Sequence, residues 1–275
     1  MKIAKVVLIV LASVVTVLFA IRYTQKQFFT DITPPVITCD SDVIEVSVRS
    51  TDDKLLAGVT ATDDVDGDIT ENVLIKSVSR LIGNQTAKIT YIVFDSSDNM
   101  ATLSREIKYT DYEKPHFKLT KPLLYNMNET VVLKDRLFAN DVIDGDISSA
   151  IKVTTSALGN TVEGFYHLTV QVTNSLGDTT VLPLTVIIYS PSSYDPCIEL
   201  TDYLVYLDQG DEFDPMDYVA AVYEKRYDTQ VISDFSKVTA EHDVDTSRPG
   251  EYTVIYGYEN NDGYTYYAVQ TVVVE

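Results

Sequence analysis

Few residues in this chain are suited to catalysis or to a disulfide scaffold. It has 275 residues with no tryptophan, two cysteines and three histidines. A disulfide-stapled fold needs more than two cysteines, and Cys39 and Cys197 lie far apart, so we favour two unpaired strand thiols over a bridge. His116, His167 and His242 are also dispersed and lack the spacing of metal ligands. These scarcities argue against a disulfide scaffold and against a histidine-based metal centre.

Sequence motifs of common enzymes are missing as well. The chain contains no Gly-x-Ser-x-Gly, no His-Glu-x-x-His and no glycine-rich phosphate loop. We therefore predict no catalytic site and no organic cofactor.

Basic residues are scarce relative to acidic ones. The chain has 21 Lys and Arg against 41 Asp and Glu, which gives a formal net charge of −20 at pH 7. A polyanion of this kind is repelled by nucleic acid phosphates and by anionic lipid headgroups, so we predict no nucleic-acid partner. Glycine and proline are too few, and hydrophobic residues at 45% too many, for a disordered chain. We expect a folded protein with an acidic surface.

One long apolar run begins near the N-terminus. Val6–Ile21 reads VVLIVLASVVTVLFAI, and two lysines precede it. As a helix this run is about 24 Å long, at the short end of a bilayer crossing. We predict a transmembrane signal anchor over residues 6–21, with a cytoplasmic N-terminus and an extracellular body, in the cell membrane. A cleaved signal peptide is the less favoured alternative, because cutting after Ala20 leaves bulky Leu18 at the −3 position.

The rest of the chain is rich in strand-length runs of Val, Ile, Thr and Tyr. Examples are Val43–Val48, Ala87–Phe94, Tyr166–Thr173, Val181–Ile188 and Tyr252–Tyr258. Beyond the leading run, no long segment carries a convincing apolar stripe of helical period. Regular short strands with turns between them are typical of β-sandwiches.

A repeat divides this β region. Ala61–Ile69 and Ala139–Ile147 share the ending Asp-Gly-Asp-Ile, and a later strand–turn–strand segment of these units recurs at Tyr252–Gly263. Prolines precede each unit in short linkers. We predict a leader comprising the anchor and a juxtamembrane linker, followed by three domains, with boundaries at residues 1–29, 30–110, 111–190 and 191–275.

The repeat has a recognisable motif. The first unit contains Gly58-Val59-Thr60-Ala61, Asp66-Gly67-Asp68-Ile69-Thr70 and Asp95-Ser96-Ser97-Asp98-Asn99, and the third contains Pro249-Gly250-Glu251-Tyr252. With these motifs the chain resembles the immunoglobulin-like repeats of bacterial surface proteins and of some pesticidal crystal proteins, which look similar to hyalin repeats. The resemblance is strong in the first unit, good in the second and partial in the third, where Tyr223–Gln230 replaces the Asp-Gly-Asp segment. It implies an all-β fold of three tandem immunoglobulin-like β-sandwiches after one N-terminal transmembrane helix, and little about activity.

Two acidic loops are candidate metal sites. They contain Asp63, Asp64, Asp66 and Asp68 in the first unit, and Asp141, Asp144 and Asp146 in the second. Hard cations such as Ca²⁺ take roughly six to eight oxygen ligands from such loops. The linker acids Asp31, Asp111 and Glu113 would add ligands if a domain junction folds beside a loop. The favoured alternative is structural, because Asp-Gly forms a tight turn and Asp side chains cap backbone amides.

Tyrosines are concentrated in the last unit. Alternation along a strand turns most of their rings toward a core, because successive side chains point to opposite faces of a sheet. An exposed ring can instead anchor a protein or stack on a sugar. The best candidates for such a partner-binding surface are Tyr223, Tyr227, Tyr264 and Tyr267.

These features together predict a membrane-anchored bacterial surface protein without catalytic activity. Its β-domains act as an extracellular structural, adhesive or partner-binding module, and the partner is a surface protein or a glycan. Two alternatives stay open: a spacer stiffened by Ca²⁺ at its acidic loops, or an accessory subunit of a membrane complex of the cell envelope.

Overall fold

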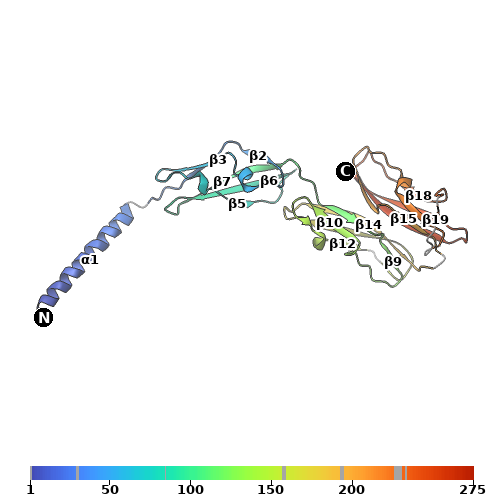
Figure 1. Cartoon of the computed structure of the whole chain (residues 1–275), viewed down its shortest axis with the longest axis horizontal. Helices are drawn as coiled ribbons and strands as arrows, with labels where there is room; N and C mark the ends of the chain where they lie inside the picture. The colour runs from blue at the N-terminus through green and yellow to red at the C-terminus, as the bar shows by residue number, and fades with distance from the viewer. Residues whose placement is uncertain are drawn as a thin grey trace. The chain divides into compact units, whose positions relative to one another are not determined.

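The secondary structure is nearly all β, as the sequence predicts. The computed structural model describes residues 2–28, 31–83, 85–156, 159–192, 195–225, 231–232 and 234–275. Within these residues it contains one long helix, a few short helical turns and strands in six sheets (Figure 1). The chain divides into two compact units, Met1–Asp111 and Tyr112–Glu275.

The N-terminal apolar run is helical. It lies in α1, which spans Lys2–Phe28 and is drawn in blue in Figure 1. Its large apolar side chains are exposed from Val7 to Ile21, and Leu8 reaches 74% exposure. The hydroxyl of Thr16 donates a 2.8 Å hydrogen bond to the backbone carbonyl of Ala12, one turn earlier. The helix therefore satisfies this polar group internally.

The prediction of a membrane anchor is wrong. In the part of the chain that the structure describes, no helix is both long enough and apolar enough to cross a bilayer. The apolar run measures about 24 Å as a helix, less than the ~30 Å of the hydrocarbon core. The predicted transmembrane helix, the membrane as a partner and the single-pass localisation with an extracellular body are corrected accordingly.

The first unit contains two sheets around one core. One sheet has the order β1-β3-β4 and the other the order β2-β7-β6-β5. The strands are β1 (Val36–Cys39), β2 (Val43–Val46), β3 (Val59–Asp63), β4 (Gly67–Asp68), β5 (Leu74–Val78), β6 (Thr86–Phe94) and β7 (Met100–Tyr109), with the short helices α2 (Asp52–Leu55) and η1 (Thr70–Asn72). Alternate residues of β6 are fully buried, at Ala87, Ile89, Tyr91 and Val93. This period-2 burial fills the core from one face of the strand.

The second unit begins with the same arrangement. Its sheets have the orders β11-β10-β8 and β12-β13-β14-β9. The strands are β8 (His116–Leu119), β9 (Leu124–Asn126), β10 (Leu137–Asp141), β11 (Gly145–Asp146), β12 (Lys152–Ser156), β13 (Gly164–Thr173) and β14 (Thr179–Tyr189), with η2 (Ser148–Ala150). The pairing of β9 with β14 is parallel, as is that of β2 with β7. The sequence repeat is therefore a structural repeat.

A third pair of sheets completes the second unit. The orders are β15-β17 and β16-β20-β19-β18. The strands are β15 (Cys197–Leu200), β16 (Leu204–Leu207), β17 (Val219–Tyr223), β18 (Thr239–His242), β19 (Gly250–Glu259) and β20 (Thr265–Val274), with η3 (Pro215–Tyr218). Tyr256, Tyr258 and Tyr266 lie in the core between these sheets. This confirms that several tyrosine rings of the last unit pack inside, in a chain that has no tryptophan.

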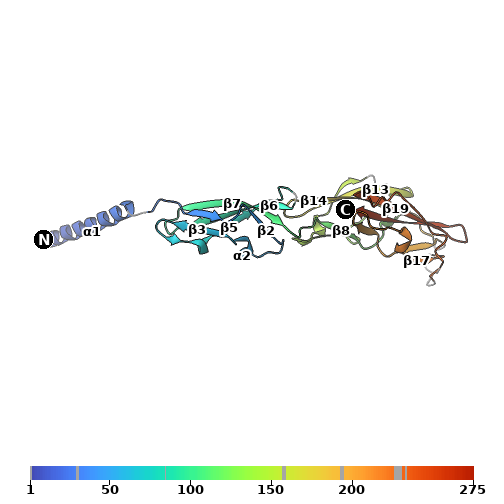
Figure 2. The same cartoon turned by 90° about the horizontal axis from the view of Figure 1, so that it is seen from above.

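Within Tyr112–Glu275 the second and third pairs of sheets, here called the second and third sandwiches, contact each other. The imidazole Nε2 of His116 lies 2.9 Å from a carboxylate oxygen of Glu275, and its ring packs edge-on against Tyr206 at 4.5 Å. The backbone N–H of Phe117 donates to the Tyr206 hydroxyl at 2.9 Å. Figure 2 accordingly shows the C-terminus beside β8. The division of the chain into three domains stays a prediction.

Candidate functional site

Most acids of the first predicted loop accept hydrogen bonds from backbone N–H groups of the same loop. Asp63 Oδ1 accepts hydrogen bonds from the backbone N–H groups of Val65 and Asp66, both at 2.9 Å. Asp68 Oδ1 accepts from the N–H of Thr70 at 3.0 Å, and the hydrogen bonds from Thr70 lower the pKa of Asp68. Asp64 is exposed. These contacts are those of a capped turn, the structural alternative of the sequence analysis.

A second contact ties this loop to the turn after β6. The carboxylate of Asp66 accepts from the N–H of Ser96 at 2.7 Å and from its hydroxyl at 2.8 Å. The second sandwich repeats the contact between Asp144 and Ser175, at 2.6 Å from the N–H and 2.7 Å from the hydroxyl. In each of these two sandwiches an acid at this position therefore joins two loops.

The second predicted loop is capped in the same way. Asp141 Oδ1 accepts from the N–H groups of Ile143 and Asp144, both at 2.9 Å. Asp146 accepts from the N–H of Ser148 at 2.9 Å, and the hydrogen bonds from Ser148 lower its pKa. In both loops most of the predicted acids thus accept hydrogen bonds from nearby backbone groups, and metal binding by these seven acids stays a prediction.

A different set of acids does converge, at one end of the first sandwich, which is the pair of sheets in Met1–Asp111. Asp31, Asp63 and Asp95 each offer a carboxylate oxygen, and these oxygens all lie within 4.8 Å of one another. Asp31 comes from the segment before β1, Asp63 from the end of β3 and Asp95 from the turn after β6. Carboxylate oxygens are the ligands that hard divalent cations prefer.

The loops fix the orientation of these three carboxylates. Asp95 is 7% exposed, and its carboxylate accepts from the N–H groups of Ser97 and Asn99, both at 2.8 Å, and from the Asn99 amide at 2.7 Å. Burial opposes its ionisation, but the hydrogen bonds from Asn99 and Ser97 outweigh burial and lower the pKa of Asp95. The Asn99 amide also donates to the backbone carbonyl of Asp31 at 3.2 Å. The segment before β1 is therefore attached to the turn that carries Asp95.

Two of these three acids are predicted from the sequence, Asp63 as a ligand and Asp31 as an optional linker ligand, whereas Asp95 is missed. The motif Asp95-Ser96-Ser97-Asp98-Asn99 contains it, but this motif enters the prediction only through the family resemblance. The linker acid Asp111 instead accepts from the Ser47 hydroxyl at 2.6 Å and from the Val48 N–H at 2.8 Å.

Among the described residues of the second sandwich, no such acid triad occupies the corresponding place. Asn174 occupies the position of Asp95, and its amide donates to Asp141 Oδ2 at 3.0 Å and to the Tyr112 hydroxyl at 2.9 Å. That hydroxyl donates to Asp178 at 2.7 Å. Burial, with the hydrogen bond to Asp178, raises the pKa of Tyr112. Neutral donors, the amide of Asn174 and the hydroxyl of Tyr112, therefore supply hydrogen bonds to the carboxylates of Asp141 and Asp178.

Three of the four predicted partner-binding tyrosines lie among the described residues, and they differ in exposure. Tyr264 and Tyr267 are 41% and 44% exposed, and Tyr223 is half-buried at the end of β17. The negative charge of Glu199 raises the pKa of Tyr223. The ring of Tyr267 packs edge-on against Phe165 of the second sandwich at 5.6 Å, and Tyr227 lies outside the described residues. Partner binding by these tyrosines stays a prediction.

An acidic hollow lies on the third sandwich, between the segment after β16 and the end of β18. Its described lining residues are Gly210, Asp211, Glu212, Phe213, Asp214, Asp217, His242, Val244 and Thr246. The ring of Phe213 packs edge-on against His242 at 5.7 Å. Four acidic residues and an aromatic pair therefore line the same hollow. Sequence reasoning missed it because its residues come from separate segments.

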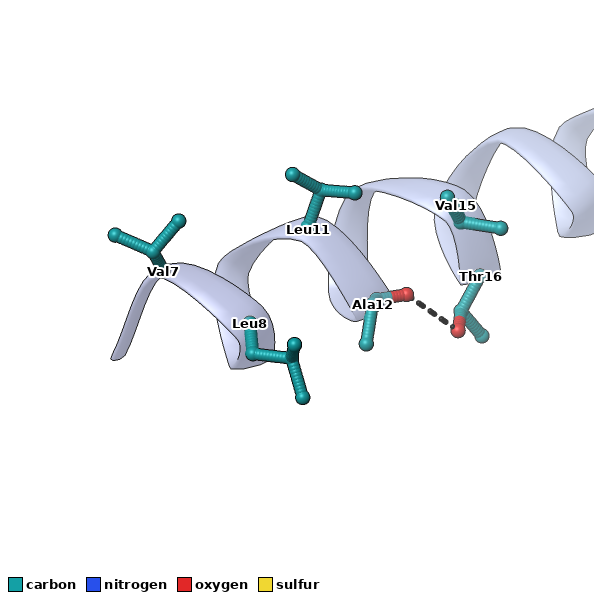
Figure 3. A pocket seen from close by; sticks show the side chains of 6 residues that line it. All are labelled: Val7, Leu8, Leu11, Ala12, Val15 and Thr16. Carbon is teal, nitrogen blue, oxygen red and sulfur yellow. Dashed lines mark hydrogen bonds between the residues drawn. The ribbon is translucent and has the colours of Figure 1, made fainter. Parts of the chain in front are cut away.

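A shallow hollow also follows one flank of α1. Figure 3 shows that all six labelled lining side chains belong to the helix itself, namely Val7, Leu8, Leu11, Ala12, Val15 and Thr16. Because one helix supplies this lining, the hollow has no opposing wall formed by a second described element. It is a feature of exposed helix surface.

The thiols and imidazoles show no pairing typical of nucleophilic catalysis in the described residues. Cys39 and Cys197 are free. Burial raises the pKa of Cys197 to about 11 and also raises that of Cys39. A thiol with a raised pKa is a poor nucleophile at neutral pH, because the thiolate is the reactive form.

The third sandwich includes a segment that matches a family model. It has β19 and β20 as a long hairpin, and Pro249-Gly250-Glu251-Tyr252 at the start of β19. Residues 200–274 match the family model described as bacterial surface protein, Ig-like domain. This Ig-like domain confirms the resemblance stated from the sequence. It coincides with the unit whose sequence motif is least complete.

Curated relatives extend the similarity beyond this Ig-like domain. Pesticidal crystal protein Cry22Aa of Bacillus thuringiensis is 26% identical over 222 residues, which cover 79% of this chain and 29% of that protein. An uncharacterised 81.3 kDa protein of Acholeplasma phage L2 is 30% identical over 177 residues, covering 60% of this chain and 23% of that protein. The chain spans less than a third of either relative.

Solved structures with similar β-domains have little sequence in common with the chain. The CBM51-2 and INT domains of Clostridium perfringens ZmpB, in complex with GlcNAc, are 20% identical with a TM-score of 0.23, over 59% of this chain and 30% of that chain. Mouse cadherin-23 EC22–24 is 12% identical with a TM-score of 0.21, over 88% and 99%. At these TM-scores the likeness carries no argument about function.

Proposed function

We propose that the chain is a non-catalytic module of a bacterial surface protein that binds a partner through its third sandwich. The acidic hollow beside Phe213 is the observation that carries this proposal. The match of residues 200–274 to a surface-protein Ig-like domain supports it, because that domain includes the hollow.

The negative charge of the hollow favours a positively charged partner. Asp211, Glu212, Asp214 and Asp217 line the hollow and are all exposed, and its described lining residues include no Lys or Arg. The whole chain has a formal charge of −20. A protein segment bearing Lys or Arg is complementary to this surface, and its cation also interacts favourably with the face of an aromatic ring such as Phe213. We therefore propose a basic protein segment as the partner.

The chemistry of the remaining candidate groups supports a binding role. The raised thiol pKa values disfavour Cys39 and Cys197 as nucleophiles. His116 contacts Glu275 and Tyr206, and His167 lies 3.2 Å from the hydroxyl of Thr185. These two imidazoles therefore interact with groups that hold strands or sandwiches together, whereas the third, His242, lines the hollow.

Titration of the full chain with a tetra-arginine peptide at low ionic strength tests the proposal. We expect the triple variant D211N/E212Q/D217N to bind at least about tenfold more weakly, because surface charge pairs dominate such an encounter. Asp214 is left intact because its side chain caps η3 by accepting from the Met216 N–H at 2.9 Å. Asp211 also accepts from the Asp208 N–H at 3.0 Å, and D211N retains a side-chain oxygen as the acceptor.

The matched control is E241Q/D243N/E251Q. It removes the same three charges from exposed positions of the third sandwich outside the hollow. Equal weakening in both triple variants would show non-specific attraction to an acidic surface and would reject the hollow as the site. Binding of a neutral GlcNAc trisaccharide in place of the peptide would favour a glycan partner.

A further inference from the structure

We propose that the first sandwich binds one Ca²⁺ ion through Asp31, Asp63 and Asp95. Their converging oxygens lie within 4.8 Å of one another. Two ligands of the same Ca²⁺, each at about 2.3–2.6 Å from the ion, are separated by at most about 5 Å. The three oxygens therefore fit around a single ion. The proposal concerns a different sandwich from the acidic hollow and does not depend on it.

Two of these carboxylates have an oxygen that is hidden from solvent and lacks a donor. Asp31 Oδ2 and Asp63 Oδ2 are buried and have no hydrogen-bond partner among the described residues. Their Oδ1 atoms are used, since Asp31 Oδ1 accepts from the Thr33 N–H at 2.9 Å and Asp63 Oδ1 from Val65 and Asp66. A buried anionic oxygen without a donor is costly. A divalent cation bound by both oxygens removes this cost.

The other two sandwiches provide an internal comparison. All three contain the same turn, closed by a backbone hydrogen bond from Asp95 to Asn99 at 3.1 Å, from Asn174 to Asp178 at 3.0 Å and from Asn260 to Tyr264 at 2.9 Å. The first residue of the turn is an acid in the first sandwich only. In the second sandwich the amide of Asn174 donates to Asp141 Oδ2. The equivalent oxygen of Asp63 is the one without a donor.

The chemistry of the ligands selects the ion. The three ligands are carboxylates, and no nitrogen or sulfur ligand accompanies them in the described cluster. Three negative charges on loops suit Ca²⁺, which accepts irregular oxygen coordination, better than Mg²⁺, which requires near-octahedral geometry and keeps its waters. Because Asp31 precedes β1, the ion links this entering segment to the loops after β3 and β6.

Calcium titration of the chelator-treated full chain, followed by calorimetry, tests the site. We expect one saturable site per chain and a higher melting temperature of the first sandwich with Ca²⁺ than with EDTA. In D95N one of the three anionic ligands becomes a neutral amide, so we expect affinity to fall at least tenfold. The substitution also costs the hydrogen bond that the Asp95 carboxylate accepts from the Asn99 amide at 2.7 Å. The readout is therefore the difference between the melting temperatures in Ca²⁺ and in EDTA, which should be smaller in D95N than in the parent chain.

The matched control is D64N, which removes the same charge from an exposed position of the same loop. It should bind Ca²⁺ within about twofold of the parent chain, because charge at a distance is screened. Equal loss in D64N and D95N would overturn the ligand set. Absence of saturable binding at millimolar Ca²⁺ would overturn the site. Equal affinity for Mg²⁺ would overturn the choice of ion.

Discussion

Asn174 donates a 3.0 Å hydrogen bond from its side-chain amide to the carboxylate of Asp141, and both residues are 6% exposed. The same amide donates to Tyr112 at 2.9 Å. One neutral side chain thus joins an acid and a phenol into a satisfied network inside the second sandwich. At the equivalent position the first sandwich has Asp95.

Substitution of Asn174 by aspartate should destabilise the second sandwich. The variant N174D loses the donor and places a second buried carboxylate beside Asp141, so we expect the unfolding free energy to fall by about 1–3 kcal/mol at pH 7. Burial beside a like charge favours the neutral acid, so part of the loss should be recovered at pH 5. Chemical denaturation at both pH values measures this, and equal destabilisation at pH 5 and pH 7 contradicts it.

Arg105 is a buried cation that joins the core of the first sandwich to the segment after β2. It is 5% exposed, and it donates to the Tyr91 hydroxyl at 2.8 Å and to the carbonyls of Leu55 at 3.0 Å and Ala57 at 2.7 Å. We expect R105M to lower the unfolding free energy by roughly 3 kcal/mol, because buried acceptors lose their donor. The control K108M removes an exposed pair with Glu45 and should change the denaturation midpoint little. Similar midpoints for both variants would show that Arg105 is dispensable.

The third sandwich should lose stability in acid through Glu224. The hydrogen bond from the Asn261 N–H, helped by the Tyr258 hydroxyl, lowers the pKa of Glu224. A lowered pKa in the folded state contributes stability above the unfolded-state pKa of about 4.3, and this contribution is lost as the pH falls through the folded value. We expect E224Q to be less stable than the parent chain at pH 7 and to lose less stability between pH 5 and pH 3. Thermal melts across this range provide the measurement, with exposed Glu251→Gln as the control.

The contact between the second and third sandwiches should depend on the hydroxyl of Tyr206. This hydroxyl accepts from the Phe117 N–H at 2.9 Å, and burial raises the pKa of Tyr206 to about 12. In Y206F the N–H loses its acceptor, and we expect a destabilisation of about 1–3 kcal/mol. The control Y252F removes an exposed hydrogen bond to the Arg248 carbonyl and should have a much smaller effect. Hydrogen exchange of the Phe117 amide reports the loss of this hydrogen bond directly. Unchanged protection of that amide in Y206F would contradict the prediction.

Local sequence patterns were sufficient to predict the strands and the repeat. Ala87–Phe94 was predicted as a strand and lies within β6, where alternate side chains are buried, because the two-residue period of a strand is a local property. The Asp-Gly-Asp segments predicted two capped turns for the same reason, and Gly67 and Gly145 adopt φ of 74° and 71° there. The apolar run predicted the helix correctly, but the predicted membrane crossing was wrong, because no described helix is both long enough and apolar enough to cross a bilayer.

Tertiary packing decided which acids meet. Asp31, Asp63 and Asp95 belong to three segments that approach one another only when the sheets of the first sandwich assemble. Their neighbours Asp64, Asp66 and Asp68 have the same chemistry and a closer spacing in the chain, yet turn geometry directs them elsewhere. The burial of Arg105 and the acidic hollow beside Phe213 were set in the same way. Residue type supplies the charge, but the fold determines its distance from other charges and from solvent, and those distances govern binding.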